Sequence, residues 1–148
     1  MNMSKDKKDL KSIAILLYVF AILDILQAIL LFYMGISGNN FGIAELAKAD
    51  PTVLNASLIA CAIIAIIEGY LEYYLGSKAM GEIKGTYTGT AHLKLAAILG
   101  ALNIVGCVMS AYGLTQGTST WFELINEVLV TILLLCYRNY CKKVKASN

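Results

Sequence analysis

Four long apolar runs alternate with short polar segments along the chain, and they span residues 13–36, 53–75, 95–114 and 121–140. A helix rises about 1.5 Å per residue, so about 20 apolar residues cross a hydrocarbon layer about 30 Å thick. Each run meets that length. The pattern predicts an all-α membrane protein, an antiparallel bundle of four transmembrane helices at approximately 12–36, 52–77, 92–114 and 119–141.

Composition supports a membrane location. Hydrophobic residues make up 58% of the 148 residues and charged residues 15%, against about 25% in soluble domains. The short polar segments leave no room for a separate soluble domain, so we expect one domain over residues 1–148. The first run exceeds the 7–15 residues of a secretory signal core and contains Asp24, which predicts a retained helix.

Basic residues predict the orientation. Every lysine and arginine except Lys48 lies near a chain end or between the second and third runs. The positive-inside rule therefore places both termini in the cytoplasm of a multi-pass plasma-membrane protein. The basic rim suits anionic lipid headgroups, whereas no soluble basic surface indicates nucleic-acid binding. The segment with Gly81, Gly85 and Gly89 is expected to be a flexible connector or to hold a lipid phosphate.

Cysteine and histidine give no metal or cofactor signature. The cysteines at 61, 107, 136 and 141 form no C-x-x-C pair, and His92 is the single histidine. We therefore expect no bound metal or cofactor and place His92 at the surface. Cys141, next to two lysines at the membrane edge, is expected to be an interfacial thiol, either unmodified or S-palmitoylated.

The polar residues inside the runs are the candidate transport residues. At 100° per residue, the first helix aligns Asp24 and Gln27 with small and apolar neighbours. The third helix aligns small residues around Asn103, and small residues let helices approach closely. The sequence predicts that Asn103 meets Asp24 and Gln27 near the midplane. The third-helix face consists of Ala96, Gly100, Asn103, Gly106, Cys107 and Ser110.

Further polar residues lie nearer the membrane surfaces. The second helix is expected to align Ser57, Cys61, Ala65, Glu68 and Glu72. The fourth is expected to align Glu123, Glu127, Leu134 and Arg138, with Asn126 to one side. These acids are expected to be solvated or to face a lumen, because water is close to them.

Asp24 carries the functional interpretation. A charge at the bilayer centre costs about 2.5–3.5 kcal/mol, and no lysine or arginine is close to Asp24 along its helix. We therefore expect a neutral Asp24 or one that binds a cation, as a relay requires. The alternative is a structural hydrogen bond to Asn103 and Gln27.

These features predict a small transporter or pore for a proton, a cation or a small polar solute, lined by Asp24 and Asn103. Four helices enclose little space, so a homo-oligomer is expected. The alternative is a non-catalytic accessory, assembly or immunity protein that binds a partner membrane protein. No Cys-His pair, H-E-x-x-H or G-x-S-x-G motif is present, so no catalytic residue is assigned and an enzyme is not expected.

Overall fold

The computed structural model describes residues 4–38, 50–116 and 121–147, apart from the side chains of residues 122 and 123. These ranges form four helices, each long and apolar enough to cross a membrane. The all-helical prediction is therefore confirmed. Lys48 and the predicted start of the last helix at 119 lie outside the described ranges. The helices are α1 (Lys5–Ser37), α2 (Pro51–Ile83), α3 (Ala91–Gln116) and α4 (Trp121–Ser147).

Three helices extend past their predicted bounds. α1 begins at Lys5 rather than near residue 12, α2 ends at Ile83 rather than 77, and α4 ends at Ser147 rather than 141. The prediction followed the apolar runs, which measure only the lipid-crossing part of a helix. Lysine, alanine and glutamate are good helix formers, so the polar flanks continue the same helices.

The ends of α2 follow from local sequence. Asp50 Oδ1 accepts hydrogen bonds from Thr52 N at 2.8 Å and Val53 N at 3.3 Å, which caps the helix before Pro51. At the other end Gly85 has a φ of +72°. Thr86 N donates to Gly81 O at 2.9 Å and Gly85 N to Glu82 O at 3.0 Å, which is a Schellman motif. The predicted flexible connector therefore starts with a defined helix cap.

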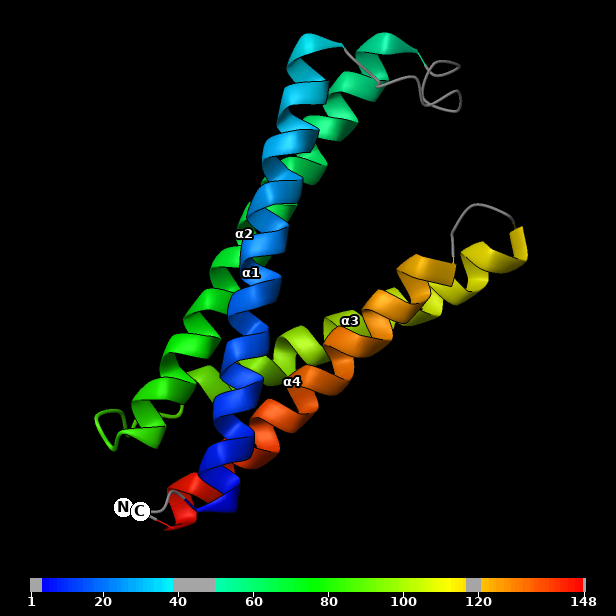
Figure 1. The fold of residues 1–148 in the computed structure, drawn as a ribbon. Coiled ribbons are helices and arrows are strands. Elements are labelled where there is room, and N and C mark those ends of the chain that lie inside the picture. Colours follow the sequence, from blue (N-terminus) through cyan, green and yellow to red (C-terminus); the bar gives the residue numbers. More distant parts are fainter. Residues whose placement is uncertain (1–3, 39–49, 117–120, 148) are drawn as a thin grey trace. The chain divides into compact units, whose positions relative to one another are not determined.

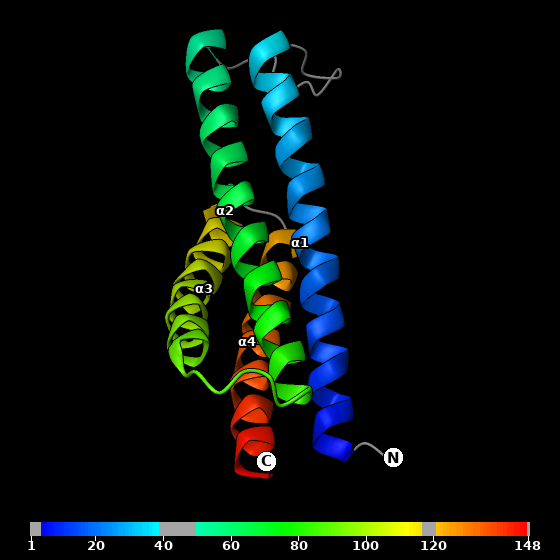
Figure 2. The ribbon, with the colours of Figure 1, turned by 90° about the vertical axis from the view of Figure 1, so that its left-hand side faces the viewer.

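The chain divides into two compact units, and each is described by itself. One unit is Leu16–Tyr74, which holds most of α1 and α2. The other combines Met1–Ile15 with Leu75–Asn148 and holds α3, α4 and the nearby ends of α1 and α2. Figures 1 and 2 show α1 beside α2, and α3 beside α4.

Small residues bring α1 and α2 together within the first unit. A β-carbon at Gly69 would lie 3.0 Å from the Ala21 carbonyl oxygen and 3.2 Å from Asp24 Cβ. The inward positions of both helices recur at an average of about 3.5 residues, the spacing of coiled coils. The α1 positions are Leu17, Ala21, Asp24, Ala28 and Leu31, and the α2 positions are Ala62, Ala65, Gly69 and Glu72.

This spacing corrects the predicted face of α2. Ser57, Cys61 and Glu68 are exposed, whereas the neighbouring Ala62 and Gly69 are buried. The predicted face assumed an ideal helix of 3.6 residues per turn, whereas the contact with α1 repeats every 3.5 residues. The two repeats diverge by about 20° per heptad. Ala65 and Glu72 of the predicted face are buried, so only its other positions are displaced from the contact.

The small-residue face of α3 packs against α4. A β-carbon at Gly100 would lie 3.9 Å from Leu134 Cβ, and one at Gly106 would lie 2.9 Å from Glu127 Oε2. Cys107 Sγ lies 3.8 Å from Thr131 Oγ1. The close-packing role that the sequence predicted for this face is therefore confirmed, with α4 as the neighbour.

We expect Gly69→Ala to destabilise the protein, because the new methyl group would press on the α1 backbone. Overpacking of this kind costs about 1–3 kcal/mol. Gly100→Ala is the matched control, because its methyl group meets only an ordinary contact at 3.9 Å. It should be neutral or stabilising by up to about 1 kcal/mol. Unfolding in mixed micelles, followed by circular dichroism, measures both, and equal stabilities would contradict the α1–α2 packing.

Candidate functional site

Two acids from neighbouring helices meet in the α1–α2 unit. The carboxyl groups of Asp24 on α1 and Glu72 on α2 lie next to each other, close enough for their charges to interact. Asp24 is half-buried and Glu72 is 8% exposed. Gly69 lies one turn before Glu72 and has no side chain to hold the helices apart. The close helix approach at Gly69 thus places two carboxyl groups between the apolar faces of α1 and α2.

The other polar residues predicted for this unit lie outside the pair. Glu68 is exposed, and it is close enough to Glu72 for its charge to act on that carboxyl group. Gln27 is exposed beside the inward line of α1, although the 100° projection placed it with Asp24. The α1 positions that face α2 are Asp24 and then Ala28, so Gln27 lies to one side of the contact.

Predicted residues on α3 and α4 are distributed rather than clustered. Asn103 Nδ2 donates to Leu99 O on its own helix at 3.0 Å. Glu127 lies against Gly106, and Asn126 is exposed. The side chain of Glu123 lies outside the described residues. The contact of Asn103 with Asp24 and Gln27 stays a prediction, because these residues belong to different units.

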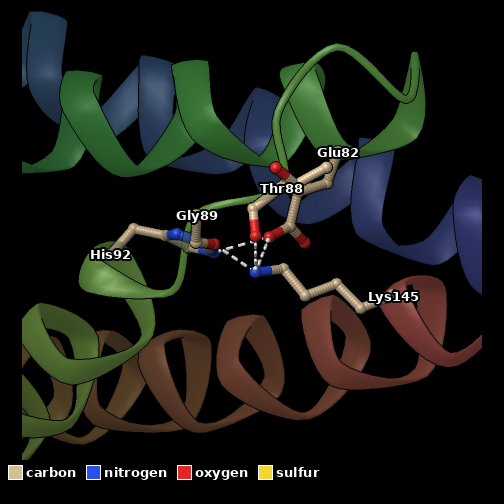
Figure 3. Close-up of polar contacts among 5 residues, drawn as sticks. All are labelled: Glu82, Thr88, Gly89, His92 and Lys145. Carbon is tan, nitrogen blue, oxygen red and sulfur yellow. Dashed lines mark hydrogen bonds and ion pairs between the residues drawn. The ribbon is translucent and has the colours of Figure 1, made fainter.

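A second polar cluster lies in the other unit, and sequence reasoning missed it. Glu82 Oε1, near the end of α2, is 2.7 Å from His92 Nε2 at the start of α3. The same oxygen is 3.2 Å from Lys145 Nζ in the last turns of α4 (Figure 3). The side chains of Glu82 and His92 are fully buried, and that of Lys145 is 23% exposed. Three helix ends thus meet at one carboxylate.

Lys145 also holds the α2–α3 connector. Its ammonium group donates to the carbonyl oxygens of Gly89 and, at 3.3 Å, Thr88 (Figure 3). The ring of Tyr87 packs beside the His92 ring at 5.2 Å between centroids, and Lys78 Nζ lies 4.6 Å above the tyrosine ring. The connector is thereby folded over the cluster.

Cys141 and Tyr137 on α4 complete this cluster. The Cys141 thiol lies within 4.8 Å of a Glu82 carboxylate oxygen. Both residues are 0% exposed, and the Tyr137 ring lies 5.9 Å from that of His92.

Two sequence predictions are wrong here. His92 was placed at the surface and Cys141 at the membrane interface, yet both are 0% exposed. The physical reason is that α2 and α4 extend about two turns beyond their apolar runs and bury these positions between them. A buried thiol is not open to palmitoylation, so the burial of Cys141 does not favour the S-palmitoylated alternative.

The cluster had one weak signal in the sequence. Glu82 continues the inward line of α2 through Ala79, and Cys141 continues that of α4 through Tyr137. Extending the 3.5-residue spacing past the apolar runs would have found both residues.

Comparison of the chain with family models, curated proteins and solved structures finds no match.

We expect Lys145→Met to destabilise the protein more than Glu82→Gln does. The first change leaves Glu82 fully buried without its ammonium partner, and breaking a buried ion pair costs about 3–5 kcal/mol. The second leaves a lysine that can turn toward water. Unfolding in detergent with a chelator present measures the difference. Lys142→Met, at an exposed position, is the control, and a Lys145→Met protein as stable as that control would contradict the ion pair.

Proposed function

We propose that the chain is a small multi-pass membrane transporter or pore, in which the Asp24–Glu72 pair takes up and releases a proton or a cation. The observation that carries the proposal is the close approach of two carboxyl groups on apolar helices, Asp24 on α1 and Glu72 on α2. Two carboxylates this close cannot both be ionised unless a cation joins them. The pair therefore has a loaded and an unloaded state, as carriers of protons or cations do.

Energetics favour this role over a structural one. An acid at the bilayer centre costs about 2.5–3.5 kcal/mol, while hydrogen bonds between membrane helices contribute about 0.6 kcal/mol on average. One hydrogen bond from Asp24 would therefore offset only a small part of the cost of placing this acid in the middle of an apolar helix. Acids retained at such positions usually mark ion or substrate pathways. Asn103 belongs to the proposal as a second lining residue.

We propose an antiparallel bundle with both termini in the cytoplasm of the plasma membrane, assembled as a homo-oligomer. An apolar groove of about 680 Å³ beside the acid pair supports the oligomer, because a second copy of the chain could cover it. Its lining includes Ile22, Ile25, Ile66 and Tyr70. The same apolar surface supports a second candidate, a non-enzymatic accessory protein whose partner covers the groove.

We expect Asp24→Asn and Glu72→Gln each to reduce proton or cation flux to the level of empty liposomes. Each change removes one of the two groups that share the proton. Flux across an imposed pH gradient in proteoliposomes, followed with a pH-sensitive dye, measures the effect. Glu68→Gln, an exposed acid on the same helix, should retain most of the flux.

Two outcomes would count against transport. Equal flux in the wild type and both variants would separate the pair from the pathway. An absence of flux in folded wild-type protein, together with a co-purifying membrane protein, would favour the accessory role.

Orientation has its own test. In a chain whose native cysteines are replaced by alanine, a cysteine at Thr52 should react with a membrane-impermeant maleimide in intact cells. Cysteines at Ser4 or Ser147 should react only after permeabilisation, because the positive-inside rule places them in the cytoplasm. These three positions are exposed, so accessibility of the side chain does not limit labelling. Labelling of Ser4→Cys in intact cells would reverse the proposed topology.

A further inference from the structure

We propose that Glu82, His92 and Cys141 form a binding site for a divalent transition-metal ion, with Zn²⁺ as the best fit. Each residue offers one ligand atom, and the three atoms lie within 4.8 Å of one another. All three residues are buried, with exposures of 1%, 0% and 0%. This site is separate from the Asp24–Glu72 pair and does not depend on the proposed transport function.

The donor set matches zinc chemistry. Carboxylate oxygen, imidazole nitrogen and thiolate sulfur are the three ligand types that proteins use for Zn²⁺. With Cys141 deprotonated on binding, the two negative charges of Glu82 and Cys141 would balance the charge of the ion. The His92 side chain is completely buried, and its Nδ1 has no hydrogen-bond partner among the described residues. A buried imidazole nitrogen without a partner is suited to ligation.

The spacing requires only a small adjustment. Tetrahedral ligands at about 2.0–2.3 Å from zinc lie roughly 3.3–3.8 Å apart. A pair at the 4.8 Å limit would close by about 1 Å, whereas Glu82 Oε1 and His92 Nε2, at 2.7 Å, would move slightly apart. The ligands come from α2, α3 and α4, so a bound ion would join three helix ends. Three protein ligands leave a fourth position for water or a small ligand, as in catalytic zinc sites.

Lys145 decides whether the ion can enter. Its ammonium group lies 3.2 Å from Glu82 Oε1, so it and a metal ion compete for the same carboxylate. The lysine side chain is 23% exposed and lies in the last turns of α4, from which it can turn toward water. Metal binding would therefore release Lys145 from Glu82 and from the connector carbonyl groups of Thr88 and Gly89.

The first experiment uses the wild-type full chain in detergent, stripped with a chelator, loaded with Zn²⁺ and desalted. We expect one zinc ion per chain. X-ray absorption at the zinc edge should show one sulfur at about 2.3 Å and nitrogen or oxygen ligands at about 2.0–2.2 Å. Zinc absent after desalting, or a zinc shell without sulfur, would overturn the proposal.

Variants locate the ligands. With Co²⁺ as a probe, the wild type should show a thiolate-to-cobalt charge-transfer band that Zn²⁺ abolishes by displacing cobalt. Cys141→Ser should lose the band, and His92→Gln should weaken binding by roughly 100-fold or more, since loss of a second-shell group alone costs about 10–100-fold. Cys136→Ser is the matched control on the same helix and should keep the band. A band that survives Cys141→Ser, or disappears in Cys136→Ser, would overturn the assignment.

Lys145→Met provides a readout that a purely structural cluster would not give. Removing the competing ammonium group should tighten Zn²⁺ binding by about tenfold or more, because a nearby like charge opposes the ion. Added Zn²⁺ should also restore the thermal stability that this variant loses in chelator, since the ion supplies the missing positive charge. Unchanged affinity and no recovery of stability would show that the cluster serves only as an ion pair.

Discussion

Close approach of helix backbones at small residues is the constraint on which the other features depend. Lipid chains are as apolar as the helices, so burial from water contributes little to helix association inside a membrane. Contact at Gly69 and Gly106 supplies the packing instead, and each glycine is also where an acid is placed. Asp24 lies across from Gly69, and Glu127 lies across from Gly106. The glycines therefore determine both how near the helices come and where polar groups are held.

The Asp24–Glu72 pair and the Glu82 cluster differ in the groups that surround their buried acids. The first brings two carboxyl groups next to each other, so that a proton or a cation between them would relieve their repulsion. The second places a carboxylate against a lysine and a histidine, so a counter-charge is built in. The first arrangement is suited to a group that changes its protonation state, and the second to a charge that is held.

The sequence was sufficient for the helices and for the packing face of α3, because both depend on local periodicity. It identified Asp24 as the acid to examine and predicted a contact with Asn103, which stays a prediction, but it did not anticipate Glu72 beside Asp24. The reason is that Glu72 comes near the end of its apolar run, where an acid needs no special explanation. His92 and Cys141 were misplaced because their burial depends on contacts between distant segments. The hydrogen bonds from Lys145 to Thr88 and Gly89, for example, join residues 57 and 56 positions apart.

That separation has a consequence for the order in which the protein is made. At about 5–20 residues per second, ribosomes take roughly 3–11 s to add the 57 residues between Thr88 and Lys145. During this interval α2 and α3 can already be inserted, while the Glu82 carboxylate still lacks its lysine. The last turns of α4 therefore act as a late closing step in biogenesis, after which the connector is held in place.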